Sequence, residues 1–133
     1  MNHQNTILVV DDEESLVKLT THVLEMRGYR VLSALNGESA LRLAASHPDK
    51  INMLLTDVKM EPHMSGCVLA QHLRPSRPEM RVVYMSSYPA SEIVRKEVEH
   101  GTATLLKKPF TPTGLLEKVK AIFSAVESGA GPG

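Results

Sequence analysis

Short runs of apolar residues alternate along the chain with longer segments in which apolar residues recur every three or four positions. The runs are typical of strands buried on both faces, and the longer segments have the period of helices with one apolar stripe. This alternation predicts βαβ units and a parallel sheet. The predicted strands are 7–11, 30–34, 51–56, 81–86 and 103–106, and the predicted helices are 14–26, 37–44, 66–73, 92–99 and 112–126.

Polar residues and proline mark where two of these helices begin. Asn36 stands directly before the helix 37–44, where a short polar side chain can accept a hydrogen bond from a free backbone N–H. Thr111 can cap the helix 112–126 in the same way, and Pro112 fits the first helical position. Five βα units of this kind predict a doubly wound α/β sheet.

The predicted strands end in residues whose chemistry is compatible. Asp11 and Asp12 follow the first strand, Asp57 follows the third, Ser86 ends the fourth, and Lys108 follows the fifth. In a doubly wound sheet, ligands bind outside the carboxyl ends of the strands, where the strand order reverses. The sequence therefore predicts that these side chains meet in one site.

Such a site suits a divalent cation and a phosphoryl group. Carboxylates about 4 Å apart repel by about 4 kcal/mol per pair at an effective dielectric of about 20, so a cation is needed among them. Oxygen ligands with open positions suit Mg²⁺, and the ammonium of Lys108 can hold a phosphoryl oxygen. Asp57 is the natural nucleophile, because a carboxylate can form an aspartyl-phosphate.

Length and composition set the class of protein. The 133 residues predict one domain, 1–128, followed by a flexible tail or linker remnant, 129–133. Fifteen basic residues balance fifteen acidic ones, which argues against nucleic-acid or membrane binding. The single cysteine, Cys67, cannot form an internal disulfide, and no apolar run reaches the ~20 residues of a membrane span. We therefore expect a cytoplasmic protein.

Four segments around these residues occur in the order and at the intervals of a known family. The set resembles the receiver domain of two-component response regulators, which includes the chemotaxis regulator, over about residues 6–126. Residues 81–110 are also similar to receivers attached to hybrid sensor histidine kinases. The segments are Leu8-Val9-Val10-Asp11-Asp12-Glu13, Leu55-Thr56-Asp57-Val58, Met85-Ser86-Ser87 and Lys107-Lys108-Pro109-Phe110.

The resemblance implies a flavodoxin-like sheet of five parallel strands in the order 2-1-3-4-5, with five helices. It implies that Asp57 accepts a phosphoryl group from a histidine kinase or a phosphotransfer protein. Asp12 and Asp57 would bind Mg²⁺ (or Mn²⁺) directly, Asp11 through water, and the backbone carbonyl of Lys59 would complete the ligands.

The resemblance also implies a switch. Lys108 would pair with the phosphoryl group, Ser86 would move toward it, and the bond before Pro109 would be cis. A surface around the fourth helix and fifth strand would then change its affinity for a downstream protein, whose identity the sequence does not indicate.

Three features depart from the family pattern. The stretch from Asp57 to Gly66 is one residue longer than usual. Leu105 stands where many receivers carry an aromatic residue whose rotation reports phosphorylation. Lys59 and Tyr88 occupy positions that in the family influence how water reaches the aspartyl-phosphate.

Two other functions compete with this interpretation. A small Mg²⁺-dependent phosphohydrolase could use Asp57 in steady turnover, although the chain shows no cap domain for an organic substrate. A receiver that only docks partners, without phosphorylation, is the second alternative. Taken alone, Asp11 and Asp12 could simply begin a helix with an acidic turn that its dipole favours.

Overall fold

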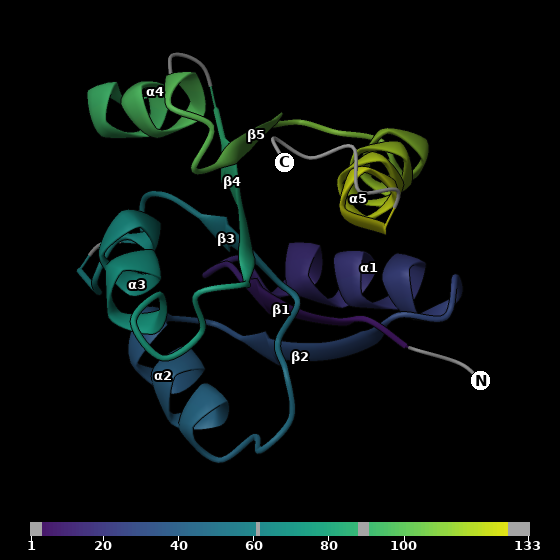
Figure 1. Cartoon of the computed structure of the whole chain (residues 1–133), viewed down its shortest axis with the longest axis horizontal. Coiled ribbons are helices and arrows are strands. Elements are labelled where there is room, and N and C mark those ends of the chain that lie inside the picture. The colour runs from purple at the N-terminus through teal and green to yellow at the C-terminus, as the bar shows by residue number, and fades with distance from the viewer. Residues whose placement is uncertain (1–3, 61, 88–90, 128–133) are drawn as a thin grey trace.

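The computed structural model describes residues 4–60, 62–87 and 91–127. It forms a five-stranded parallel sheet in the order β2-β1-β3-β4-β5, with α1 and α5 on one face and α2, α3 and α4 on the other (Figure 1). The predicted doubly wound fold and strand order are confirmed. The elements are β1 Thr6–Val10, α1 Glu14–Glu25, β2 Arg30–Ala34, α2 Gly37–Ala45, β3 Met53–Asp57, α3 Gly66–Leu73, β4 Arg81–Ser86, α4 Glu92–Glu99, β5 Thr104–Lys107 and α5 Pro112–Glu127.

Alternation along β1 divides the core into two layers. Leu8 and Val10 pack with α2, α3 and α4, whereas Ile7 and Val9 pack with α1 and α5. All four side chains are fully buried, which explains why the strand is apolar from Ile7 to Val10, and its first residue, Thr6, is polar but also buried. Among the described helices, none is long and apolar enough to cross a membrane.

Both predicted helix caps are formed. The Asn36 side chain accepts a hydrogen bond from the Ser39 N–H at 2.8 Å. Thr111 Oγ1 accepts one from the Gly114 N–H at 2.9 Å. Each cap satisfies a backbone donor that the first helical turn leaves without a partner.

Three strands have bounds that differ from the prediction. β1 is shifted by one residue, to Thr6–Val10 instead of 7–11. The third strand begins at Met53 rather than Ile51, and it includes Asp57. Ile51 is buried without belonging to the strand, so burial alone explains its apolar character. β5 is shifted by one residue, to Thr104–Lys107. The predicted tail, 129–133, lies outside the described residues.

The single cysteine is buried in α3 and gives a first testable prediction. Cys67 is 5% exposed, and burial raises the pKa of its thiol, so less of the reactive thiolate is present at neutral pH. We expect iodoacetamide at pH 8 to modify the native protein at least roughly tenfold more slowly than the urea-unfolded chain. Equal rates, followed by mass spectrometry, would show that the α3 packing described above is wrong.

Candidate functional site

The acidic residues converge at the carboxyl edge of the sheet. Asp57 is the last residue of β3, and Asp11 directly follows β1. The two strands are neighbours, and Val10 pairs with Thr56, so both carboxylates emerge at the same level. Asp11, Asp12 and Asp57 each offer a carboxylate oxygen within 4.8 Å of the others.

Asp11 is the buried member of the three, with 1% of the residue exposed. Its Oδ1 accepts a hydrogen bond from the Glu13 N–H at 2.9 Å, which fixes the turn into α1. Its Oδ2 accepts one from Lys108 Nζ at 2.7 Å. Both oxygens therefore already have protein partners, which suits contact with a cation through water better than direct ligation.

Asp57 lies between a positive and a negative neighbour. Its Oδ1 accepts a hydrogen bond from the Val58 N–H at 3.0 Å and lies 3.3 Å from Lys108 Nζ. Within residues 4–60, 62–87 and 91–127, no group donates a hydrogen bond to Oδ2. Burial, and then the charge of Asp11, raises the pKa of Asp57, and Lys108 only partly opposes this. The positive charge of Lys108 thus does not offset burial and the charge of Asp11, and among the described residues Oδ2 accepts no hydrogen bond.

Lys108 provides the ammonium at this edge. Its backbone N–H donates to the Ser86 carbonyl at 2.8 Å, which aligns it beside the end of β4. Burial alone would lower the pKa of Lys108, but the hydrogen bond and charge of Asp11, aided by Asp57, leave it raised. The side chain therefore stays charged at neutral pH. The Lys108–Pro109 peptide bond is cis.

Asp12, Lys59 and Ser86 lie in different surroundings. Asp12 and Lys59 are exposed. The Ser86 hydroxyl is half-buried, and its one proton is donated to the Ser87 carbonyl at 2.9 Å. A hydrogen bond from Ser86 to a group on Asp57 would therefore require this hydroxyl to turn.

The two remaining positions singled out in the sequence differ in what the structure shows. Leu105 is half-buried and packs against the cluster under α2, α3 and α4. It is an ordinary aliphatic part of the core, in the place where many receivers have an aromatic ring. Tyr88 lies outside the described residues.

One residue of the site was missed by sequence reasoning. Gly66 begins α3, and its N–H donates to the Val58 carbonyl at 2.8 Å. A Cβ at this position would overlap the carbonyl oxygen of Asp57 and come within 3.0 Å of Thr56 Cγ2. Glycine thus lets α3 start directly against the backbone of Asp57. Its place after Ser65, which caps the helix, was the signal available in the sequence.

The donor set fits a hard divalent cation. Carboxylate oxygens of three residues lie together, Asp12 is exposed to solvent, and the pKa of Asp57 is raised. Mg²⁺ prefers such oxygen ligands and keeps several waters. The ammonium of Lys108 does not by itself balance three neighbouring carboxylates.

Comparison with known proteins identifies the family. Residues 7–120 match the response regulator receiver domain. The chain belongs to the response regulator receiver domain family. It is therefore similar to the signalling domains through which two-component systems operate.

Relatives and solved structures agree with this assignment of the receiver domain. The alkaline phosphatase synthesis transcriptional regulatory protein PhoP of Bacillus subtilis is 34% identical over 124 residues, which are 93% of this chain and 50% of PhoP. A CheY-like receiver domain protein from Methanospirillum hungatei JF-1 has a TM-score of 0.82 at 29% identity, covering 96% of this chain and 99% of that one. The receiver domain of the hybrid histidine kinase CckA has a TM-score of 0.73 at 32% identity, covering 88% and 97%. The chain thus spans about half the length of PhoP.

Proposed function

We propose that this receiver domain accepts a phosphoryl group on Asp57 in a reaction that depends on Mg²⁺ or Mn²⁺. The observation that carries the proposal is the Asp57 carboxylate, which lies beside the Lys108 ammonium and two more carboxylates and whose Oδ2 accepts no hydrogen bond from the described residues. A carboxylate in this setting can act as a nucleophile, while the surrounding charges stabilise the phosphoryl group during transfer.

The transfer itself is a displacement at phosphorus. Asp57 Oδ2 attacks the phosphorus of a phosphohistidine, an O–P bond forms, and the P–N bond breaks, so that its electron pair returns to the imidazole of the donor. Lys108 Nζ, already 3.3 Å from Asp57 Oδ1, can hold a phosphoryl oxygen. When bound by Asp12, Asp57 and the Lys59 carbonyl, with Asp11 acting through water, the cation supplies positive charge that offsets the phosphoryl oxygens.

The donor in this proposal is a histidine kinase or a phosphotransfer protein, and the reaction takes place in the cytoplasm. Attack of water on the acyl phosphate later releases inorganic phosphate and restores the carboxylate. In the phosphorylated state, the Ser86 hydroxyl turns from the Ser87 carbonyl toward the phosphoryl group. That movement shifts an equilibrium between two conformers and alters the surface that a downstream protein binds.

The structure gives less support to a phosphohydrolase with an organic substrate. A broad cavity of about 1010 Å³ lies at the opposite edge of the sheet, where Asn52, Arg81 and Thr104 precede or begin their strands. Asp11, Asp12 and Asp57 do not line this cavity. A phosphate ester bound there would be separated from Asp57 by the length of the strands.

Lys108→Ala provides a test of the proposed switch. We expect acetyl phosphate to label Asp57 still, while spectral changes at Ser86 and α4 fall by at least about half, because the phosphoryl group loses its ammonium partner. Heteronuclear NMR with Mg²⁺ and beryllofluoride, a phosphoryl mimic, measures the response. Lys18→Ala, on an exposed part of α1, is the matched control. An undiminished response in Lys108→Ala would remove Lys108 from the switch.

A further inference from the structure

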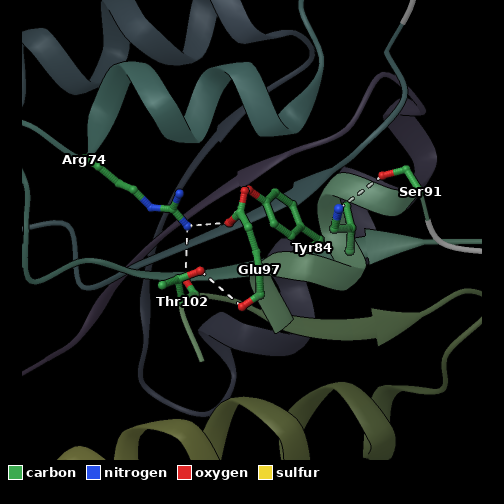
Figure 2. A network of polar contacts seen from close by, with 6 residues as sticks. Arg74, Tyr84, Ser91, Glu97 and Thr102 are labelled. Atoms are coloured by element: carbon green, nitrogen blue, oxygen red, sulfur yellow. Dashed lines mark hydrogen bonds and ion pairs between the residues drawn. The ribbon is translucent and has the colours of Figure 1, made fainter. Parts of the chain in front are cut away.

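Helix α4 depends on few buried contacts for its position. Val94 is its buried side chain, whereas Ile93 is 57% and Val98 is 38% exposed. The Glu97 carboxylate also attaches α4 to neighbouring elements through polar contacts. The Tyr84 hydroxyl on β4 donates its one proton to the Glu97 carboxylate and lies 3.0 and 3.1 Å from the two carboxylate oxygens (Figure 2). The same carboxylate accepts one from Arg74 Nη2 at 2.7 Å.

Arg74 and Thr102 extend this attachment to the end of the helix. Arg74, which caps α3, also donates to the Thr102 carbonyl at 3.0 Å (Figure 2). The Thr102 N–H and hydroxyl both donate to the Glu97 carbonyl, at 2.9 and 3.1 Å. Gly101, at φ +77°, donates to the Val98 carbonyl, which completes a Schellman ending. We call Arg74, Tyr84, Glu97 and Thr102 the α4 network.

The α4 network is costly to break, because its central groups are withdrawn from water. Tyr84 is fully buried, so water cannot accept a hydrogen bond from its hydroxyl if the contact with Glu97 is lost. Burial, and then the neighbouring Cys67 and Glu97, raises the pKa of Tyr84 well above its ordinary value. The hydroxyl therefore remains protonated and keeps donating. The Glu97 and Arg74 side chains are 15% and 32% exposed, which limits screening of their ion pair.

The network lies at the end of α4 that is remote from Asp57. Arg74 and Thr102 line the cavity at the amino edge of the sheet, together with Arg81, the first residue of β4. The beginning of α4 instead follows the carboxyl end of β4, where Ser86 lies. Ser86 and Tyr84 are two residues apart on one strand, so their side chains share a face of the sheet.

From this arrangement we infer that Glu97 is a positioning residue that anchors the C-terminal end of α4, so that movement driven from the phosphoryl site pivots the helix about this end. The pivot rests on the proposed function; the anchor itself does not. The moving part is then the N-terminal half of α4, which carries the exposed Ile93.

Hydrogen exchange of the full chain without any phosphoryl mimic tests the anchor. In Glu97→Gln, the amides of Gly101 and Thr102 are expected to exchange roughly tenfold faster or more, since a charge-assisted hydrogen bond is lost. Glu92→Gln is the matched control, because it makes the same change on the same helix at an exposed pair with Lys96. Tyr84→Phe removes one hydroxyl and should raise the same exchange rates. Rates equal to those of the control in both variants would overturn the anchor.

NMR with Mg²⁺ and beryllofluoride tests the pivot. In the parent, the chemical-shift changes on adding the mimic should be larger at residues 92–95 than at residues 97–102, which include the end of α4 and the turn after it. In Glu97→Gln, these chemical-shift changes should be similar in both segments. A purely structural role would lower stability without moving this distribution. An even distribution in the parent would overturn the pivot. If the parent shows no change at Asp57 and Ser86, the proposed function and the pivot both fail, whereas the exchange result still decides the anchor.

Discussion

Asp57→Asn is expected to reduce phosphoryl transfer from acetyl phosphate below detection while the domain stays folded. The amide that replaces the carboxylate cannot form the acyl phosphate, although it occupies nearly the same volume beside Lys108. Phosphate-affinity electrophoresis measures the labelling, and circular dichroism confirms the fold. Asp49→Asn, an exposed aspartate near Arg30, is the matched control and should label like the parent. Retained acyl-phosphate labelling in Asp57→Asn would assign the acceptor elsewhere.

The same variant has a predicted effect on stability. Because the pKa of Asp57 is raised in the fold, its charged form is less favourable there than in the unfolded chain. Without a cation, the parent should therefore lose stability as the pH rises through the ordinary and the raised pKa, and Asp57→Asn should lose less. At neutral pH without Mg²⁺, Asp57→Asn should have the higher Tm, and Mg²⁺ should raise the Tm of the parent more than that of the variant.

Gly66→Ala is expected to have the largest effect on stability. The added Cβ would overlap the Asp57 carbonyl oxygen, and a backbone atom cannot move aside as the end of a flexible side chain can. Overpacking of this kind costs about 1–3 kcal/mol, and each kcal/mol lowers the Tm of a domain of this size by about 4 °C. Because the displaced atom belongs to the acceptor residue, labelling of Asp57 should become slower as well.

Thermal unfolding by circular dichroism measures the effect of Gly66→Ala, since the chain has no tryptophan. Gly114→Ala is the control. It is also near the start of a helix, but among the described residues its Cβ would meet only Thr111 Oγ1, at 3.2 Å. A Tm for Gly66→Ala equal to that of the parent would show that α3 does not begin against the Asp57 backbone.

The fold was predictable because burial leaves a strong pattern in the sequence. Strands covered on both faces are largely apolar, as β1 is from Ile7 to Val10, so the polar residue that follows each strand stands out. Since parallel strands end at one edge, the proximity of Asp11, Asp57 and Lys108 followed from topology alone. The predicted start of the third strand at Ile51 was wrong, because this residue is buried without belonging to a strand.

Contacts between positions far apart in the sequence were not predictable in this way. Glu97 meets Arg74 and Tyr84 only because α3, β4 and α4 are neighbours at particular heights along the sheet. Neither the periodicity of apolar residues nor a local motif predicts where along the strands these elements lie beside one another. The contact of Gly66 with the Asp57 backbone depends in the same way on how closely α3 approaches β3.

Mass spectrometry after treatment with acetyl phosphate and Mg²⁺ tests the central claim most directly. The account predicts one phosphoryl group per chain, which hydroxylamine removes, and which maps to Asp57 in the peptide analysis. Omission of Mg²⁺ should prevent labelling. A phosphoryl group on any other residue, or no labelling of the folded parent with Mg²⁺ present, would contradict the account.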